Sequence, residues 1–162
     1  MDVTSKIKSR RSVRKYLKKK ISLEIISDVL DCARFAPTAR NVQPWFFVAV
    51  TDEEKLTCLG GLADHGGFIA DCAACFAIFA KKDEKYYLED GCAATMNIIH
   101  ALNMHGIGSC WVAGDKKKYC EDVRELLDVG VEYTLVSLVS AGYGDGVYNT
   151  PKNQLKDVSK FM

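Results

Sequence analysis

The sequence of 162 residues predicts a single α+β domain. Helical periodicity and short apolar runs follow one another without the regular strand–helix–strand order of a doubly wound sheet, which favours α+β. Hydrophobic residues make up 48% of the chain and charged residues 27%. This balance provides the core of one ordinary domain and does not imply a second one.

Two helices and two strands are predicted in the first half of the chain. Ser22 is a candidate N-cap for a helix over residues 22–35, where apolar side chains recur with helical spacing. The aromatic and β-branched run at 45–50 predicts a strand. The capping box at 51–54 then opens a short helix that we expect to end at Gly60 and Gly61. A second buried strand is predicted at 75–80.

The second half begins with a long helix over residues 85–105, with Gly106 as its stop. A short strand follows at 109–113, then a helix capped by Asp115 and ended near Gly130, and a last strand at 133–143. The terminal segment 146–162 is mostly polar but carries Leu155, Val158 and Phe161 at helical spacing. Such an arm packs either against a partner subunit or on its own domain.

The charge is unevenly distributed along the chain. Nine of the 22 basic residues lie within the first 20 positions, where Asp2 is the only acidic residue. The net charge of +1 is therefore the sum of a basic amino-terminal segment and an acidic remainder. Arg10, Arg11, Ser12 and Arg14 fall within five residues. Guanidinium groups bind phosphate oxygens in two-point geometry, so this basic segment predicts an anionic ligand.

A basic arm that binds nucleic acid is the alternative interpretation, because several phosphates would be neutralised in a salt-dependent way. No helix-turn-helix, zinc or RNP pattern accompanies the charge, however, and we do not expect nucleic acid as a partner.

The composition also indicates where the protein works. The longest uninterrupted apolar run, residues 72–80, is too short to cross a bilayer, and the basic amino end has no apolar region of a secretion signal. We therefore expect a soluble, cytoplasmic protein without a membrane partner. Its seven cysteines are expected to be reduced thiols. Cys72 and Cys75 have the spacing of a metal or redox pair, but nothing completes a ligand set, so we expect core packing and no metal.

Two further segments have the features of binding loops. The loop at 37–45 places Thr38, Asn41 and Gln43 between two stiffening prolines, a pattern suited to contacting a polar ring edge. The segment 106–114 has glycines around Trp111, which let backbone N–H groups approach a flat cofactor.

Four motifs in this order resemble the FMN-dependent nitroreductase family: Arg-Arg-Ser-x-Arg-x-Tyr, Pro-Thr-x-x-Asn-x-Gln-Pro-Trp, Asp90-Gly91 with Ala93, Ala94 and Asn97, and Gly-Ile-Gly-Ser-Cys-Trp-Val-x-Gly. The resemblance implies one FMN-binding domain over residues 1–162, with a central, mainly antiparallel sheet flanked by helices. It also implies an intertwined homodimer with FMN at the interface and the arm 146–162 exchanged. The implied activity is ping-pong transfer of two electrons from NAD(P)H to a nitroaromatic, a quinone or a similar acceptor.

The resemblance also implies roles for single residues. Arg10 and Ser12 would hold the phosphate and ribityl chain, with Arg11 beside them, and Arg14 would lie at the N1 side of the ring, where reduced flavin is anionic. The partner's loop would contribute Pro37, Thr38, Ala39, Asn41 and Gln43. The ring would lie against Trp111, Val112, Ala113 and Gly114, with a backbone N–H of Ala113 or Gly114 at N5. No catalytic side chain is implied, because flavin N5 does the chemistry and Arg14, Ala113 and Gly114 tune it.

Three features concern the rim of the implied site. Lys152 matches a tail residue that reaches the phosphate, but Gln154 stands where the family usually has a second basic residue, and an amide cannot neutralise a dianion. The chain is short between residues 80 and 91, which predicts an open pocket. His65 is a candidate for the pyrimidine edge of the ring.

Overall fold

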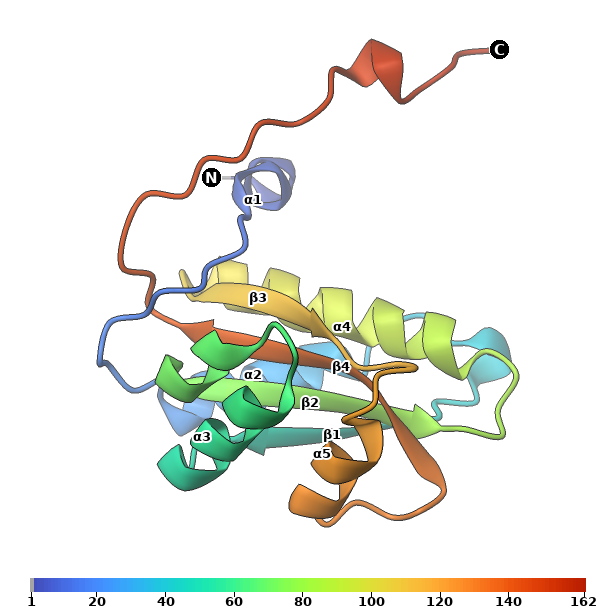
Figure 1. Ribbon diagram of the computed structural model, residues 1–162. Coiled ribbons are helices and arrows are strands. Elements are labelled where there is room, and N and C mark those ends of the chain that lie inside the picture. Colours follow the sequence, from blue (N-terminus) through green and yellow to red (C-terminus); the bar gives the residue numbers. More distant parts are fainter. Residues whose placement is uncertain (1) are drawn as a thin grey trace.

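The computed structural model describes residues 2–162, and four strands form its antiparallel sheet in the order β1-β2-β4-β3 (Figure 1). The strands are β1 (Trp45–Val50), β2 (Ala74–Lys81), β3 (Gly108–Ala113) and β4 (Tyr133–Gly142). The central strands β2 and β4 are almost completely buried, which explains their continuous apolar sequences. The outer strands β1 and β3 lie at opposite edges of the sheet. Predicted binding segments that adjoin these two strands are therefore separated within one chain.

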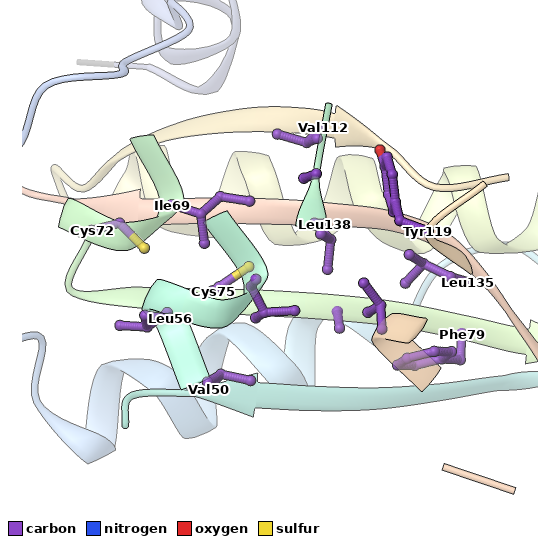
Figure 2. Packing of buried hydrophobic residues seen from close by; sticks show 14 of the residues in the cluster. Val50, Leu56, Ile69, Cys72, Cys75, Phe79, Val112, Tyr119, Leu135 and Leu138 are labelled. Atoms are coloured by element: carbon purple, nitrogen blue, oxygen red, sulfur yellow. The ribbon is translucent and has the colours of Figure 1, made fainter. Parts of the chain in front are cut away.

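Helices cover both faces of the sheet (Figure 1). The helices α2 (Leu23–Ala33) and α4 (Tyr87–Met104) pack on one face, and α3 (Glu53–Leu62) and α5 (Cys120–Leu126) on the other. Figure 2 shows the core on the second face, which contains Leu56 and Ile69 from the covering segments and Phe79 and Leu138 from the sheet. The prediction of an α+β fold with an antiparallel sheet is confirmed.

The remaining elements are short. Helix α1 (Val3–Ser9) lies beside the end of α4, where the Asn103 side chain donates to the Lys6 carbonyl at 2.8 Å. Three 3₁₀ turns complete the chain: η1 (Ala39–Asn41), η2 (Gly67–Asp71) and η3 (Leu155–Asp157). Within residues 2–162, none of the helices combines the length and the apolar character that spanning a bilayer requires.

The predicted helix caps and helix stops are confirmed only in part. Ser22 caps α2 as expected, but Asp52 rather than Thr51 caps α3, accepting the Lys55 N–H at 2.9 Å. The prediction that α3 ends at Gly60 and Gly61 is wrong, because the helix continues to Leu62. A Cβ on Gly60 would lie 3.0 Å from the Ala70 nitrogen, so this glycine allows η2 to pack closely.

Asp115 does not cap a helix either, since α5 begins at Cys120 after Tyr119. The Asp115 carboxylate instead accepts the Tyr87 hydroxyl at 2.8 Å and joins the end of β3 to α4. Gly106 follows α4 with a left-handed φ of 72°, as predicted for a helix stop.

After β4 the chain first returns to the amino-terminal segment and then leaves the body. Asp145 N–H donates to the Lys15 carbonyl at 3.0 Å, and the Tyr148 hydroxyl donates to the same carbonyl at 3.1 Å. Beyond this point the tail runs past α1 and away from the sheet (Figure 1). Its apolar side chains are exposed, with 89% for Phe161. Packing of this arm on a partner stays a prediction.

Candidate functional site

The basic segment lies along the outer edge of β3. Val13 N–H donates to the Ser109 carbonyl at 2.9 Å, and Ser12 and Ser109 form a parallel bridge. Further along, Leu17 N–H donates to the carbonyl of Tyr143 at the end of β4, at 2.8 Å. The segment is therefore held on the sheet by its backbone, and Arg14 keeps an exposed side chain.

Three of the predicted phosphate and ring contacts influence the same thiol of β3. Burial raises the pKa of the Cys110 thiol, whereas the guanidinium of Arg14, the hydroxyl of Ser12 and the guanidinium of Arg10 act to lower it. The joint contact of Arg10, Ser12 and Arg14 with one ligand stays a prediction.

The guanidinium of Arg11 has a different role. Its Nη1 donates to the carbonyls of Lys8 and Arg10 at 2.8 and 2.9 Å, so Arg11 satisfies the end of α1. The Arg11 Nε is buried and has no hydrogen-bond partner among the described residues. Of the two contributions expected from Arg11, the one through its backbone fits this arrangement better.

The charges of the basic segment are not compensated within the chain. Among residues 2–162, Arg10, Arg11 and Arg14 form no ion pair, and Arg14 instead lies 5.8 Å from the centre of the Phe68 ring. Like charges in one short segment repel one another, so a bound anion would stabilise the folded chain. Guanidinium and hydroxyl donors fit a phosphate ester such as the one FMN carries.

Next to the basic segment, the outer edge of β3 presents backbone groups. Ser109 uses this edge to bind Val13, and backbone groups alternate between the two edges of a strand, so Trp111 and Ala113 also direct theirs outward. Gly114 N–H is already engaged, because it donates to the Val136 carbonyl at 3.1 Å. Of the two predicted donors to N5, Ala113 is therefore the one that faces the edge.

The side chains of this strand do not share one face. Trp111 packs in the core beside α4, whereas Val112 packs in the core beside α3 and α5. A flat ring at the edge of β3 would therefore meet the backbone of 111–113 and not the faces of both side chains.

The loop between α3 and η2 and the first turn of η2, which contains Phe68, lie close to both parts of this edge. Phe68 contacts Arg14, as described above, and the Asp64 carboxylate adds to the effect of burial in raising the pKa of Tyr119. The Tyr119 hydroxyl in turn donates to the Ala113 carbonyl. His65 is an exposed residue of this loop. The structure thus brings His65 to the neighbourhood of the edge, and its contact with a ring stays a prediction.

The loop 37–43 lies elsewhere, before the opposite outer strand β1 (Figure 1). Pro37, Asn41 and Gln43 are exposed, whereas Thr38 and Ala39 are partly buried against Asp90. Lys152 and Gln154 are exposed on the outward-running tail. A single chain therefore does not bring this loop to Arg10 and Arg14, whereas Gly146 and Tyr148 at the start of the tail line a pocket together with Arg10.

Two pockets flank the basic segment. One of about 270 Å³ is lined by Lys6, Arg10, Arg11 and Ser109, among others. A larger one of about 620 Å³ lies between Lys18 and η2 and contains none of the predicted site residues. We place the candidate site at the smaller pocket and along the adjoining edge of β3, because donors for an anion are concentrated there.

Sequence reasoning assigned no individual role to Tyr16, Asp90 and Cys110. Tyr16 and Asp90 are polar, with exposures of only 8% and 6%, and each hydrogen-bonds a predicted binding segment. A polar residue within an apolar pattern was the available signal for Asp90, which stands directly before Gly91 in the first turn of α4.

Comparisons with known proteins identify the family of the chain. The model of the nitroreductase family matches residues 7–65, which include the basic segment and the loop 37–43. An Archaeoglobus fulgidus protein, provisionally named NADH dehydrogenase/NAD(P)H nitroreductase, is 36% identical over 143 residues, covering 85% of this chain and 82% of that protein.

Solved structures share the whole fold. An FMN-dependent nitroreductase from Clostridium difficile superposes with a TM-score of 0.90 at 27% identity, covering 98% of both chains. A Bacteroides thetaiotaomicron protein superposes with a TM-score of 0.93 at 24% identity, covering 98% of this chain and 96% of that one, and supports the fold alone. Since the sequence match extends over most of both proteins, this chain belongs to the nitroreductase family.

Proposed function

We propose that this protein is an FMN-dependent oxidoreductase that passes two electrons from NAD(P)H to an electron-poor acceptor, such as a nitroaromatic or a quinone. The observation that carries the proposal is the pairing of the basic segment with the outer edge of β3 through Ser12 and Ser109, where Arg10 and Arg14 have no carboxylate partner in residues 2–162. When bound, FMN supplies the redox chemistry, because its N5 takes a hydride from the donor and passes it on.

The residues of the chain bind and tune the cofactor in this proposal. Arg10 and Ser12 hold the phosphate end by charge-assisted hydrogen bonds. Arg14 would stabilise negative charge on the reduced ring, and Ala113 would supply a backbone N–H donor to it. Donor and acceptor use one site in turn, which is a ping-pong sequence. Initial rates at several donor concentrations are then expected to give parallel double-reciprocal lines.

A second copy of the chain completes the site. The loop 37–43 adjoins one outer strand and the basic segment the other, so the loop of the partner would cover this chain's FMN. The exposed apolar side chains of the tail support an arm exchanged between subunits. All seven cysteines are free thiols, which fits the reducing conditions of the cytoplasm.

An absorbance spectrum tests the proposal. The purified protein is expected to be yellow, or to become yellow with added FMN, at about one FMN per chain. Anaerobic NADH or NADPH bleaches the flavin band, and an added quinone restores it. A protein that stays colourless with FMN overturns the proposal. Retention on DNA at moderate salt by such a colourless protein supports the nucleic-acid alternative.

A further inference from the structure

The carboxylate of Asp90 binds two consecutive residues of the loop 37–43. Its Oδ2 accepts the Thr38 hydroxyl at 2.7 Å, and its Oδ1 accepts the Ala39 N–H at 3.1 Å. Asp90 is only 6% exposed and lies in the first turn of α4. A buried carboxylate is costly unless it is hydrogen-bonded, so both oxygens are committed to this loop.

Thr38 connects Asp90 to the other end of the loop. Its hydroxyl gives its one proton to Asp90 and accepts the Gln43 N–H at 3.1 Å. Between these points Arg40 and Asn41 have φ values of 53° and 58°, and Gln43 itself has 53°. Non-glycine residues keep this left-handed backbone only where their surroundings hold them in place.

The position of Asp90 is itself fixed against the sheet. Gly91 follows it, and a Cβ on Gly91 would come within 2.7 Å of the Val136 side chain in β4. Helix α4 therefore sits closely on the sheet at this turn, and the loop takes its place from a rigid element.

We infer that Asp90 is a positioning residue that holds the loop 37–43 in the shape needed to contact the ligand of the partner subunit. The inference rests on the proposed function, which places that loop over the partner's FMN. Asp90 touches no residue of the basic segment among its hydrogen bonds and acts through Thr38 and Ala39. By holding the loop, Asp90 keeps the exposed side chains of Asn41 and Gln43 in position for that ligand.

The test is Asp90→Asn in the full chain, measured by FMN titration and by amide hydrogen exchange of the loop. A carboxamide keeps one acceptor but turns an N–H₂ group toward one of two donors. We expect FMN affinity to fall about 10- to 100-fold, as for lost hydrogen bonds to a charged group. Exchange at Ala39 and Gln43 is expected to accelerate.

Glu89→Gln is the matched control. Glu89 occupies the same first turn of α4 and is exposed, so this variant removes the same charge without touching the loop. It is expected to keep wild-type FMN affinity and exchange. An equal loss in both variants overturns the inference, because the helix terminus and not the loop contact would then be responsible.

A second variant serves if Asp90→Asn does not fold. Thr38→Val removes the hydroxyl at nearly constant shape and is expected to reproduce both the loss of affinity and the faster exchange at Ala39 and Gln43, with Glu89→Gln again as the control. Wild-type affinity and exchange in Thr38→Val, or in a folded Asp90→Asn, overturn the inference. If wild type binds no FMN, the proposed function fails, while the exchange data still decide whether Asp90 holds the loop.

Discussion

The hydroxyl groups of Tyr16 and Ser140 lie 2.7 Å apart in the interior, below the basic segment. The Tyr16 hydroxyl donates its one proton to the Val13 carbonyl at 2.6 Å, so Ser140 must donate to Tyr16. Burial raises the pKa of Tyr16 far above its usual value, which keeps this donor protonated. Through Tyr16, the central strand β4 fixes the backbone next to Arg14.

Tyr16→Phe is expected to lower the free energy of unfolding by about 1–3 kcal/mol, because the ring stays while the buried Val13 carbonyl loses its donor. It is also expected to weaken FMN binding, since Arg14 is held less firmly. Urea unfolding of the apoprotein and FMN titration measure the two effects. Tyr143→Phe is the control, because the Tyr143 hydroxyl makes no hydrogen bond within residues 2–162. Equal stability losses in the two variants would contradict the role of Tyr16.

Substitutions of Arg10 and Arg14 are expected to affect different properties of the bound FMN. Arg10→Ala removes a phosphate contact, so FMN affinity is expected to fall about 10- to 100-fold. Arg14→Ala removes the cation that favours the anionic reduced ring, so the two-electron reduction potential is expected to drop by about 30–60 mV. Lys15→Ala, an exposed neighbour in the same segment, controls for loss of charge alone. Unchanged affinity in the first variant, or an unchanged potential in the second, would refute the division of roles.

The buried thiol of Cys72 predicts a loss of stability at alkaline pH. Burial raises the pKa of Cys72 from 9.0 to about 11. The folded chain therefore keeps a proton that the unfolded chain releases, so the contribution is complete below pH 9.0 and is lost as the pH rises toward about 11. Over that range wild type should lose about 2–3 kcal/mol more than Cys72→Ala.

Urea unfolding with reductant at several pH values measures this difference. Cys58→Ala is the control for removal of a thiol, because Cys58 is exposed. If Cys72→Ala also follows the wild-type slope, the thiol does not titrate as proposed.

The fold was predictable where the local pattern decides the structure. The apolar run Trp45–Val50 is strand β1 to the residue, and Ser22 caps α2. The failures at Gly60 and Asp115 share a cause, because each residue has a local preference that a distant contact overrides. Gly60 accommodates Ala70, and Asp115 accepts a hydrogen bond from Tyr87.

The candidate site, like the fold, was predictable only where residues close together in the sequence decide the structure. Arg10, Ser12 and Arg14 are neighbours in sequence, so their proximity could be expected from the motif. The engagement of Gly114 with Val136 and of Asp90 with Thr38 depends on pairs 22 and 52 positions apart in the chain. Such long-range contacts decide which backbone N–H faces the ligand and which residue holds the loop, and a single sequence does not contain them.

A substitution in the tail is expected to raise the affinity for FMN. The resemblance implies a second basic residue at the position of Gln154, so Gln154→Arg is expected to tighten FMN binding about 10-fold by adding a charged phosphate contact. The salt dependence of binding should become steeper, because the added contact is electrostatic. Asn149→Arg, on an exposed residue of the same segment, is the control for added charge. Equal gains from both variants would show that net charge, rather than position 154, is responsible.

Subunit mixing tests whether each site uses two chains. Arg10→Ala damages the basic segment and Asn41→Ala the loop, so a heterodimer of the two has one site with both changes and one with neither. Random exchange makes half of the dimers mixed, and about a quarter of the sites should regain tight FMN binding. Arg10→Ala mixed with Ser12→Ala should regain none, because both changes lie in the same segment and every site keeps one. Recovery in neither mixture would mean that loop and basic segment do not meet across the dimer. Recovery only in the first requires that the loop of one chain serves the basic segment of the other.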